Sequence, residues 1–416
     1  MIKKIIVSFC LFFSLVLIAQ EGTSSPYSFY GIGDIKFKGT VENRSMGGIS
    51  VFPDSIHMNL QNPAHLASLK LTSFAIGTTY ATTKSRSEID DAKAKRTTLD
   101  YLAIGIPVGK LGIGFGLIPY SSVGYKLQKL SSDATPIFSR YTGIGGINKV
   151  FIGIGYKLTK KINIGANLQY NFGTIKTTNL RFQEGLQYGT RENNASDIRG
   201  VNLDLGLTYQ TKVNSKYSFF SSLSYTPEAK ITLGNSRTIE IIQFLSSGAV
   251  SVIEQDKIPV QDTTIKLPAK LALGSGFGEV KKWLIGGEIT FLQNSVISNR
   301  FRDINGSAFE NSIRYSVGGF YIPNYNSYSN YVKKMVYRGG IRYENTGLVI
   351  QNKSITDFAA NFGLGLPLGG TFSNINIGLE VGKRGTVYYN LVEENYVNLS
   401  IGLSLSERWF VKRKFD

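Results

Sequence analysis

The chain has 416 residues, of which 42% are hydrophobic and 18% are charged, and its mean hydropathy is -0.04. This balance excludes a disordered chain, and 45 glycines with 11 prolines exclude the collagen-like and proline-rich classes. Beyond the N-terminus, no run approaches the roughly 20 apolar residues that a membrane-spanning helix needs. The 23 tyrosines and 25 phenylalanines favour β structure, and the transmembrane β-barrel is the membrane class that remains open.

Residues 1–20 have the pattern of a secretory signal peptide. Two lysines form a positive start, residues 5–18 form an apolar stretch, and Ala19 offers a small residue for cleavage. A retained anchor helix is the alternative, but the apolar stretch is short and no basic cluster follows it. The only cysteine, Cys10, lies inside this segment, so the mature chain has no thiol for a disulfide, a metal site or a nucleophile.

The formal net charge is +17, and it is +15 once the two lysines of the signal are removed. A charge of this size usually points to nucleic acid. Here the basic residues are spread over connecting segments and the chain is exported, so we expect no nucleic-acid partner. A basic surface facing the anionic head groups of outer-membrane lipids, or a basic lumen, explains the charge better.

Residues 21–70 do not alternate in polarity, and we expect them to form a plug, or hatch, inside the barrel. A barrel of fourteen strands, which the rest of the chain predicts, leaves an open lumen unless something fills it. A loose periplasmic tail is the alternative, but the segment is too apolar for a solvated tail. Two short motifs lie in it, with the members Arg44, Gly47, Gly48, Asn62, Pro63 and Ala64.

Residues 71–410 repeat one pattern, in which apolar residues alternate with small or polar ones over roughly 10 positions, the length of a strand that crosses the outer membrane. A soluble sandwich also alternates, but the Gly, Asn, Ser and Thr of the polar face suit a wet lumen. We therefore predict an all-β fold, a 14-stranded antiparallel transmembrane β-barrel. The expected strands are 72–83, 98–107, 111–121, 148–158, 162–175, 199–210, 217–226, 265–277, 281–293, 313–322, 334–344, 357–366, 373–382 and 396–405.

The predicted connections alternate between short and long, as periplasmic turns and external loops do in such barrels. Residues 323–333 break this rule, because a short turn is expected there. An even number of strands places both termini in the periplasm, with Trp283 and Trp409 near strand ends on that side and residues 411–416 as a short basic tail. The long external loops are expected at 84–97, 122–147, 176–199, 227–264 and 384–395.

These features together resemble the FadL/TodX-type outer-membrane transporters of long-chain fatty acids and aromatic hydrocarbons. The resemblance rests on an exported chain with Arg-Ser-Met-Gly-Gly at 44–48, Asn-Pro-Ala at 62–64 just before the first strand, and fourteen alternating strands. Residues 267–274, at the opening of the eighth strand, are also similar to the family's pattern. The resemblance covers nearly the whole mature chain, and the order of the motifs makes it more specific than any one of them.

The resemblance implies a monomeric barrel that takes a hydrophobic small-molecule ligand from outside, holds it in an apolar lumenal pocket and releases it sideways into the membrane. The release route would be a gap at an irregular third strand. That strand here carries Gly112, Gly114, Gly116 and Pro119, and glycine and proline within a strand mark bulges and missing ladder bonds. The alternative is that the glycines form the small-residue face of the lumen.

The sequence offers little for catalysis. Its two histidines, His57 and His65, both lie in the predicted plug without partners at a motif spacing, so we expect no enzyme, no metal site and no cofactor. Charges that face the lumen are the candidate ligand contacts, since they persist there only if hydrated, paired or bound to a ligand. Pairs with the plug are the alternative. The candidates are Arg338, Arg342, Arg314, Asp204, Glu288 and Glu380.

Two main functions follow from this interpretation, and a non-transporting structural porin is a third alternative. The first is passive uptake of hydrophobic small molecules, such as fatty acids, through a plugged lumen in the outer membrane. The alternative is an accessory, protein-binding barrel whose partner is a subunit of an outer-membrane secretion or surface-assembly machinery, because a fold does not fix a function.

Overall fold

The computed structural model describes residues 22–408 except 132–135, 184, 246–249, 301–305, 328 and 370–371. The expected signal peptide at 1–20, Trp409 and the expected basic tail at 411–416 lie outside the described residues. Within the described ranges, no helix has the length and apolar character needed to cross a membrane.

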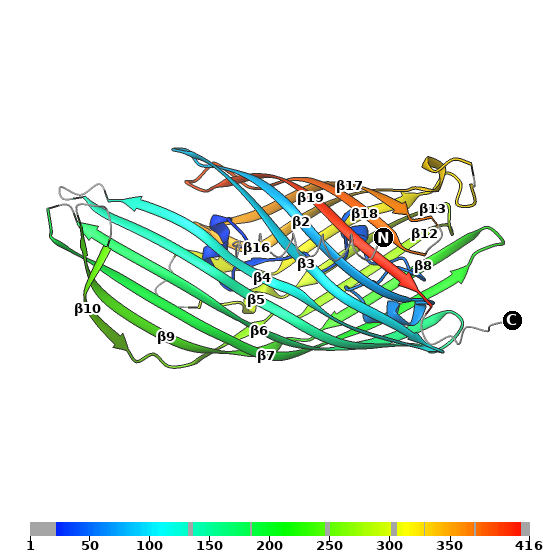
Figure 1. The fold of residues 1–416 in the computed structure, drawn as a ribbon, viewed down its shortest axis with the longest axis horizontal. Helices are drawn as coiled ribbons and strands as arrows, with labels where there is room; N and C mark the ends of the chain where they lie inside the picture. Colours follow the sequence, from blue (N-terminus) through cyan, green and yellow to red (C-terminus); the bar gives the residue numbers. More distant parts are fainter. Residues whose placement is uncertain are drawn as a thin grey trace, which may run out of the picture.

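Fourteen long strands form a closed antiparallel barrel (Figure 1). The last strand pairs with the first over fifteen residue pairs, from Glu393–Arg86 to Glu407–Thr72, so the sheet has no free edge at this seam. The predicted 14-stranded transmembrane barrel with an N-terminal plug is thus confirmed. The strands are β2 (Thr72–Arg86), β3 (Asp91–Val108), β4 (Leu111–Leu130), β5 (Ile137–Lys157), β6 (Ile162–Gln183), β7 (Tyr188–Lys212), β8 (Tyr217–Thr226), β12 (Lys270–Glu279), β13 (Trp283–Leu292), β15 (Ser312–Tyr321), β16 (Val336–Ile350), β17 (Lys353–Pro367), β18 (Asn374–Gly385) and β19 (Glu393–Glu407).

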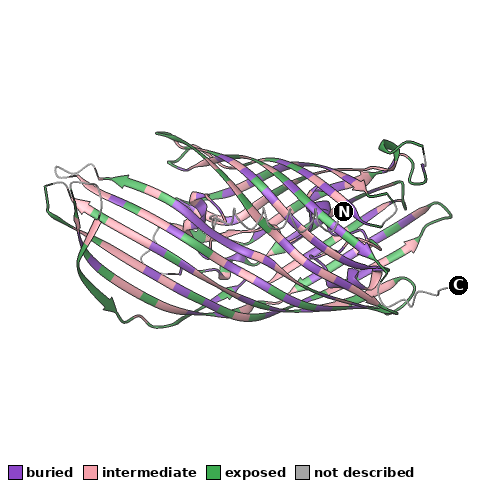
Figure 2. Ribbon diagram, in the orientation of Figure 1, coloured by how far each residue is buried: buried purple, intermediate pink, exposed green. Residues whose placement is uncertain are grey.

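Buried and exposed residues alternate along the strands (Figure 2), and the two faces of the sheet also differ in polarity. In β6, Asn167 and Gln169 are buried toward the lumen, while Leu168 and Tyr170 are exposed on the outer wall. An apolar outer face exposed all around a closed barrel is what contact with lipid requires. The polar inner face can be buried only because other parts of the chain fill the lumen.

We call the barrel end where β2 begins and β19 ends the near end, and the opposite end the far end. Toward the far end the strands run well beyond the 9–11 residues that a membrane crossing needs; β7, for example, has 25. The segments expected to be loops at 84–97, 122–147 and 176–199 are therefore largely strand. Many residues of these extensions are charged or polar, so a continuous hydrophobic period is absent, although Val123, Tyr125 and Ile198 belong to a buried apolar cluster.

The segment expected to be a loop at 227–264 also contains strands. β9 (Ala229–Phe244) continues the line of β8 and pairs with the far half of β7, and β10 (Val250–Ile258) and β11 (Thr263–Leu267) pair with β9. A short strand, β14 (Ser307–Phe309), pairs with the far end of β16. The long connection between β15 and β16 is confirmed, and it contains η4 (Val332–Lys334).

β3 and β4 are paired along only part of their length. Their ladder runs from Val108–Leu111 to Leu102–Leu117 and stops there, although both strands continue toward the far end. On its other side β4 stays paired with β5, with a register shift just after Pro119. In Figure 1 the hairpin of β2 and β3 diverges from β4, and the blue N-terminal segment is visible between them. The barrel wall is therefore open between β3 and β4 in its far half.

The N-terminal residues 22–69 lie inside the barrel. Their elements are η1 (Pro26–Phe29), β1 (Asp34–Ile35), α2 (Val41–Arg44) and η2 (Pro63–Ser68). The Thr40 side chain caps α2 by accepting a hydrogen bond from the Asn43 amide. Buried apolar residues of this segment, such as Val41, Ile49 and Leu66, form core clusters with residues of the wall.

Candidate functional site: a plugged lumen with a charged cavity

The Asn-Pro-Ala motif fixes the plug to the wall at the near end. The Asn62 side chain donates to Ser222 Oγ at 2.8 Å and to the Leu223 carbonyl at 3.0 Å, and its oxygen caps η2 by accepting from the Ala64 amide. The following proline starts the 3-10 turn with a preset φ. Gly165 of β6 gives the turn room, because a Cβ there would lie 2.5 Å from the Ala64 nitrogen.

Two glycines of β4 serve the same contact between plug and wall. A Cβ on Gly112 would lie 1.9 Å from the Leu66 carbonyl oxygen, and one on Gly114 would lie 2.7 Å from the Leu66 side chain. Gly116 faces the Leu102 carbonyl in the same crowded way. All three glycines lie within intact ladders to β3 and β5. Gly112 and Gly114 make space for the plug, whereas Gly116 makes space for neighbouring residues of the wall. The opening in the wall starts only beyond them, near Pro119.

The second motif fixes the plug to the opposite wall. The Arg44 guanidinium donates to Thr79 Oγ1 at 2.6 Å and to Ser400 Oγ at 3.0 Å, and it lies 3.3 Å from the Asp100 carboxylate. Gly47 has φ +70°, and a Cβ there would lie 2.7 Å from the carbonyl of Ile341. Gly48, with φ +88°, follows in the same left-handed region, so the turn after α2 needs both glycines.

Two of the predicted lumenal charges hold the plug. Glu288 is buried and accepts hydrogen bonds from the Ser50 amide at 2.9 Å and the Ser50 hydroxyl at 2.7 Å. Arg338 donates to the Asn376 side chain at 3.0 Å, which in turn donates to Glu42 of the plug at 2.8 Å. For both residues, these contacts correspond to the alternative given above, in which a lumenal charge pairs with the plug and not with a ligand. We call residues 40–69, which all these contacts fix, the inner plug.

The opening between β3 and β4 is filled by residues 22–36, which we call the strap. Its strand β1 pairs antiparallel with the free edge of β4, Asp34 opposite Ser122 and Ile35 opposite Ser121. β1 thus takes the place along β4 that β3 occupies in the near half. Only two residue pairs form this ladder, so its backbone pairing is short.

The strap also reaches both sides of the opening with its side chains. Arg96 of β3 donates to Ser24 Oγ at 2.6 Å, and the Gly124 amide of β4 donates to Ser28 Oγ at 3.2 Å. The strap therefore spans the gap. It is held by these hydrogen bonds and by Tyr27 and Ile32, which are buried in apolar clusters with the wall.

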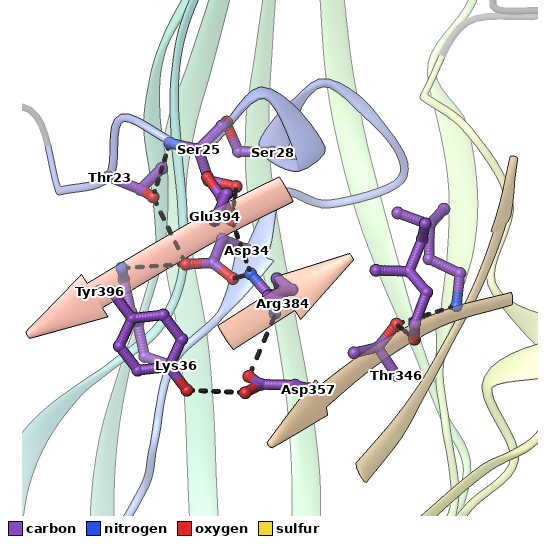
Figure 3. A network of polar contacts seen from close by, with 12 residues as sticks. Thr23, Ser25, Ser28, Asp34, Lys36, Thr346, Asp357, Arg384, Glu394 and Tyr396 are labelled. Atoms are coloured by element: carbon purple, nitrogen blue, oxygen red, sulfur yellow. Dashed lines mark hydrogen bonds and ion pairs between the residues drawn. The ribbon is translucent and has the colours of Figure 1, made fainter. Parts of the chain in front are cut away.

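A network of charged groups holds the middle of the strap against β18 and β19 (Figure 3). Asp34 lies 2.8 Å from the Arg384 guanidinium and 3.2 Å from the Lys36 ammonium, and Ser25 donates to Glu394 at 3.0 Å. Burial by itself raises the pKa of Asp34, but the charges of Arg384 and Lys36 outweigh burial and hold this pKa below its ordinary value. The Asp34 carboxylate is therefore ionised.

The same network extends along the wall. Arg384 also approaches Asp357, which accepts a hydrogen bond from the Tyr396 hydroxyl at 2.6 Å. Arg342 donates to the Tyr396 oxygen at 2.8 Å and lies 3.4 Å from both Asp357 and Glu380. Arg342 and Glu380 thus face the lumen as predicted by the alternation, and the structure pairs them with each other.

A cavity of about 250 Å³ lies between the strap, the inner plug and the wall. The apolar pocket that the resemblance implies is not found there, because charged side chains from both plug and wall line the space. Arg314, Arg342 and Glu380 of the predicted set border it; Asp204 borders a smaller cavity, and Arg338 and Glu288 border neither. The charged residues that line the cavity of about 250 Å³ are Asp34, Lys36, Lys38, Arg44, Arg96, Asp100, Lys270, Arg314, Arg342, Glu344, Asp357, Glu380, Arg384 and Glu394.

Sequence reasoning missed Asp34, Arg96 and Arg384. Asp34 lies in a segment without periodicity, and the other two lie in stretches expected to be loops, where alternation carries no signal. The signal that could have indicated these residues was the run of charges on both sides of an expected loop.

The two histidines have structural contacts. His57 Nδ1 lies 2.7 Å from the Asp54 carboxylate, and His65 Nε2 lies 2.7 Å from the Ser50 carbonyl. Burial lowers the pKa of His65 to about 4, so its ring is neutral. In the described part of the chain, no three His, Cys, Asp or Glu side chains are grouped as metal ligands.

A closed fourteen-stranded barrel, apolar outside and plugged by its own N-terminal segment, defines an outer-membrane barrel of the FadL/TodX fold. The chain belongs to the BamG family, whose model matches residues 1–416. A search of curated protein sequences found no match.

Solved structures confirm the predicted fold. The toluene transporter TodX of Pseudomonas putida is 17% identical, with 91% of this chain and 100% of TodX covered at a TM-score of 0.58. The toluene transporter TbuX of Ralstonia pickettii is 16% identical, covering 89% and 99% at 0.58. A FadL homologue of Pseudomonas aeruginosa is 10% identical, covering 89% and 98% at 0.59. Identities this low establish a shared fold.

Proposed function

We propose that this protein carries hydrophobic small molecules, such as fatty acids, passively across the outer membrane, and that they leave through the opening between β3 and β4. The observation that carries the proposal is the end of the β3–β4 ladder at Leu102–Leu117, with only the strap beyond it. Exposed apolar side chains such as Leu99 and Phe115 lie on the outer wall next to this junction. A molecule that leaves there therefore enters an apolar environment.

The charged cavity limits the kind of molecule that the protein can carry. A purely apolar ligand would remove water from the ionised groups without replacing their hydrogen bonds, which is unfavourable. A ligand with an apolar body and a polar or ionised head satisfies both the cavity and the apolar exit. We include no catalysis, cofactor or energy coupling in this proposal.

The proposed topology follows the barrel rule that short connections lie in the periplasm. Residues 1–20 are the signal, 21–70 the plug, 71–410 the barrel and 411–416 the tail. β2 begins and β19 ends at the same end of the barrel, which we place in the periplasm together with both termini. We propose a monomeric barrel, since its wall closes on itself within one chain.

Uptake of a radiolabelled long-chain fatty acid tests this function. Cells whose outer membrane contains the protein should take up the label faster than matched cells without it. A variant that lacks residues 22–36 should be faster still, because the strap blocks the exit. Equal rates with and without the protein would contradict the transport function.

A second function, a protein-binding barrel within an outer-membrane assembly, is supported by a different observation. β10 pairs with β9 along one edge, and its other edge has no strand partner among the described residues. Residues 253–258 of β10 are exposed, and an open strand edge is a site where another chain can add a strand. Native mass spectrometry of protein extracted in mild detergent distinguishes the two, since bound lipid supports transport and a co-purifying subunit supports the assembly role.

A further inference from the structure

Four cationic side chains converge at one place in the lumen. Lys38 comes from the plug between the strap and the inner plug, Lys149 from β5, Lys270 from β12 and Arg314 from β15. Burial and the positive charges of the other three lower the pKa of Lys38, and the nearby carboxylate of Asp204 acts against them. Elements far apart in the sequence therefore bring like charges together.

Lys149 is the most buried member of this cluster. Its side chain is 6% exposed, and it makes no hydrogen bond or ion pair with any described residue. Its ammonium lies 4.7 Å from the centre of the Tyr120 ring, and the Lys38 ammonium lies 3.9 Å from the same centre. One aromatic ring thus faces two ammonium groups, which compensates their charge only in part.

The negative charge available in this place is small. Asp204 is buried and accepts a hydrogen bond from Thr226 Oγ1 at 2.8 Å. The three lysines and Asp204 all line a cavity of about 40 Å³, which also meets the amides of Gln169 and Asn202. Buried charges of one sign are unfavourable unless an opposite charge is bound.

This small cavity borders the larger one. Lys38, Gln61, Lys270 and Leu292 line both, and Arg314 lines the larger one beside them. A group held by the lysines would therefore lie next to the cavity of about 250 Å³.

We propose that Lys38, Lys149 and Lys270, with Arg314 beside them, form a binding site for a phosphate group, free or at the head of an amphiphile. Three ammonium groups against one carboxylate match a divalent oxyanion better than a single charge. Ammonium groups bind phosphate oxygens through short charge-assisted hydrogen bonds. The site does not depend on the lateral opening, so anion binding and uptake can fail separately.

Calorimetric titration of the full chain in detergent with inorganic phosphate tests the site. The wild type should bind phosphate. The double variant Lys149→Met with Lys270→Met should bind it at least about tenfold more weakly, because two of the positive charges that attract the phosphate are lost. Lys157→Met is the matched control, since Lys157 is an exposed lysine on the same strand. No binding by the wild type, or equal affinity in the double variant, overturns the proposal.

Asp204→Asn gives a test of opposite sign that does not rely on the double variant folding. It removes the one carboxylate while keeping an oxygen that accepts from Thr226, so phosphate should bind several-fold more tightly. Unchanged or weaker binding overturns the proposal. Hexyl phosphate in place of inorganic phosphate identifies the source of the group: tighter binding indicates an amphiphile head, and equal affinity indicates free phosphate.

Discussion

The inner plug and the strap belong to one N-terminal segment, yet they hold to the barrel by different means. The inner plug packs its backbone against strand glycines and buries apolar side chains in shared clusters. The strap shares part of this packing, since Tyr27 and Ile32 are buried in clusters with the wall. Its ladder has only two residue pairs, however, and its polar and ionic contacts lie beside a cavity. Close packing has no alternative arrangement at low free energy, whereas polar contacts can be exchanged for water. We therefore expect the inner plug to stay fixed and the strap to move.

The largest effect is expected from crowding the inner plug. Gly112→Ala places a Cβ 1.9 Å from the Leu66 carbonyl oxygen, so η2 or β4 must move. We expect the free energy of unfolding to fall by about 3 kcal/mol, measured by urea titration in micelles. Gly369→Ala is the control, because nothing lies within 4 Å of a Cβ there. Equal stability of the two variants would show that the plug is not closely packed on β4.

Removing the Glu288 carboxylate should loosen the inner plug alone. Glu288→Ala leaves the buried Ser50 amide without its acceptor, at a loss of about 2 kcal/mol. Hydrogen exchange of residues 45–60 should become faster by more than tenfold, with no change in the strap. Exposed Glu254→Ala provides the comparison. Faster exchange in the strap as well would show that the two parts move as one.

The converse substitution should loosen the strap alone. Asp34→Asn removes the charge that faces Arg384 at 2.8 Å, while the hydrogen bonds of Ser24 and Ser25 remain. We expect a loss of about 1 kcal/mol and severalfold faster exchange of residues 22–36. Asp256→Asn, at an exposed position of β10, should change nothing. If exchange of the strap is unaltered, its charged network does not hold it.

The smallest effect concerns pH. Burial lowers the pKa of His57, but the Asp54 and Glu42 carboxylates outweigh burial and raise it above its ordinary 6.5. A raised pKa of a base stabilises the folded state fully below 6.5, and this stabilisation is lost as pH rises through the folded value. Asp54 is 45% exposed, which weakens the effect through solvent screening. Unfolding measured from pH 5 to 9 should show this loss in the wild type, and the same slope in His57→Gln would contradict it.

The sequence predicted the near half of the barrel better than the far half. Ile162 to Phe172 alternates because one face meets lipid and the other the lumen, and the structure has that stretch as predicted. Beyond the membrane this contrast ends, so the far halves of β3 and β7 look like loops. The same limit explains which residues of the site could be predicted. Arg342 and Glu380 follow from alternation, whereas Asp34 comes from a segment whose position depends on tertiary packing.

Two engineered disulfides test most directly whether the strap moves while the inner plug stays. Ile35→Cys with Ser121→Cys joins the strap to β4 at paired positions. Val41→Cys with Gly402→Cys joins the inner plug to β19, where the two Cβ positions lie 3.2 Å apart. We predict that the first bond stops fatty-acid uptake until a reductant is added and that the second leaves uptake unchanged. Uptake that continues with the strap locked, or stops only with the inner plug locked, would contradict the account.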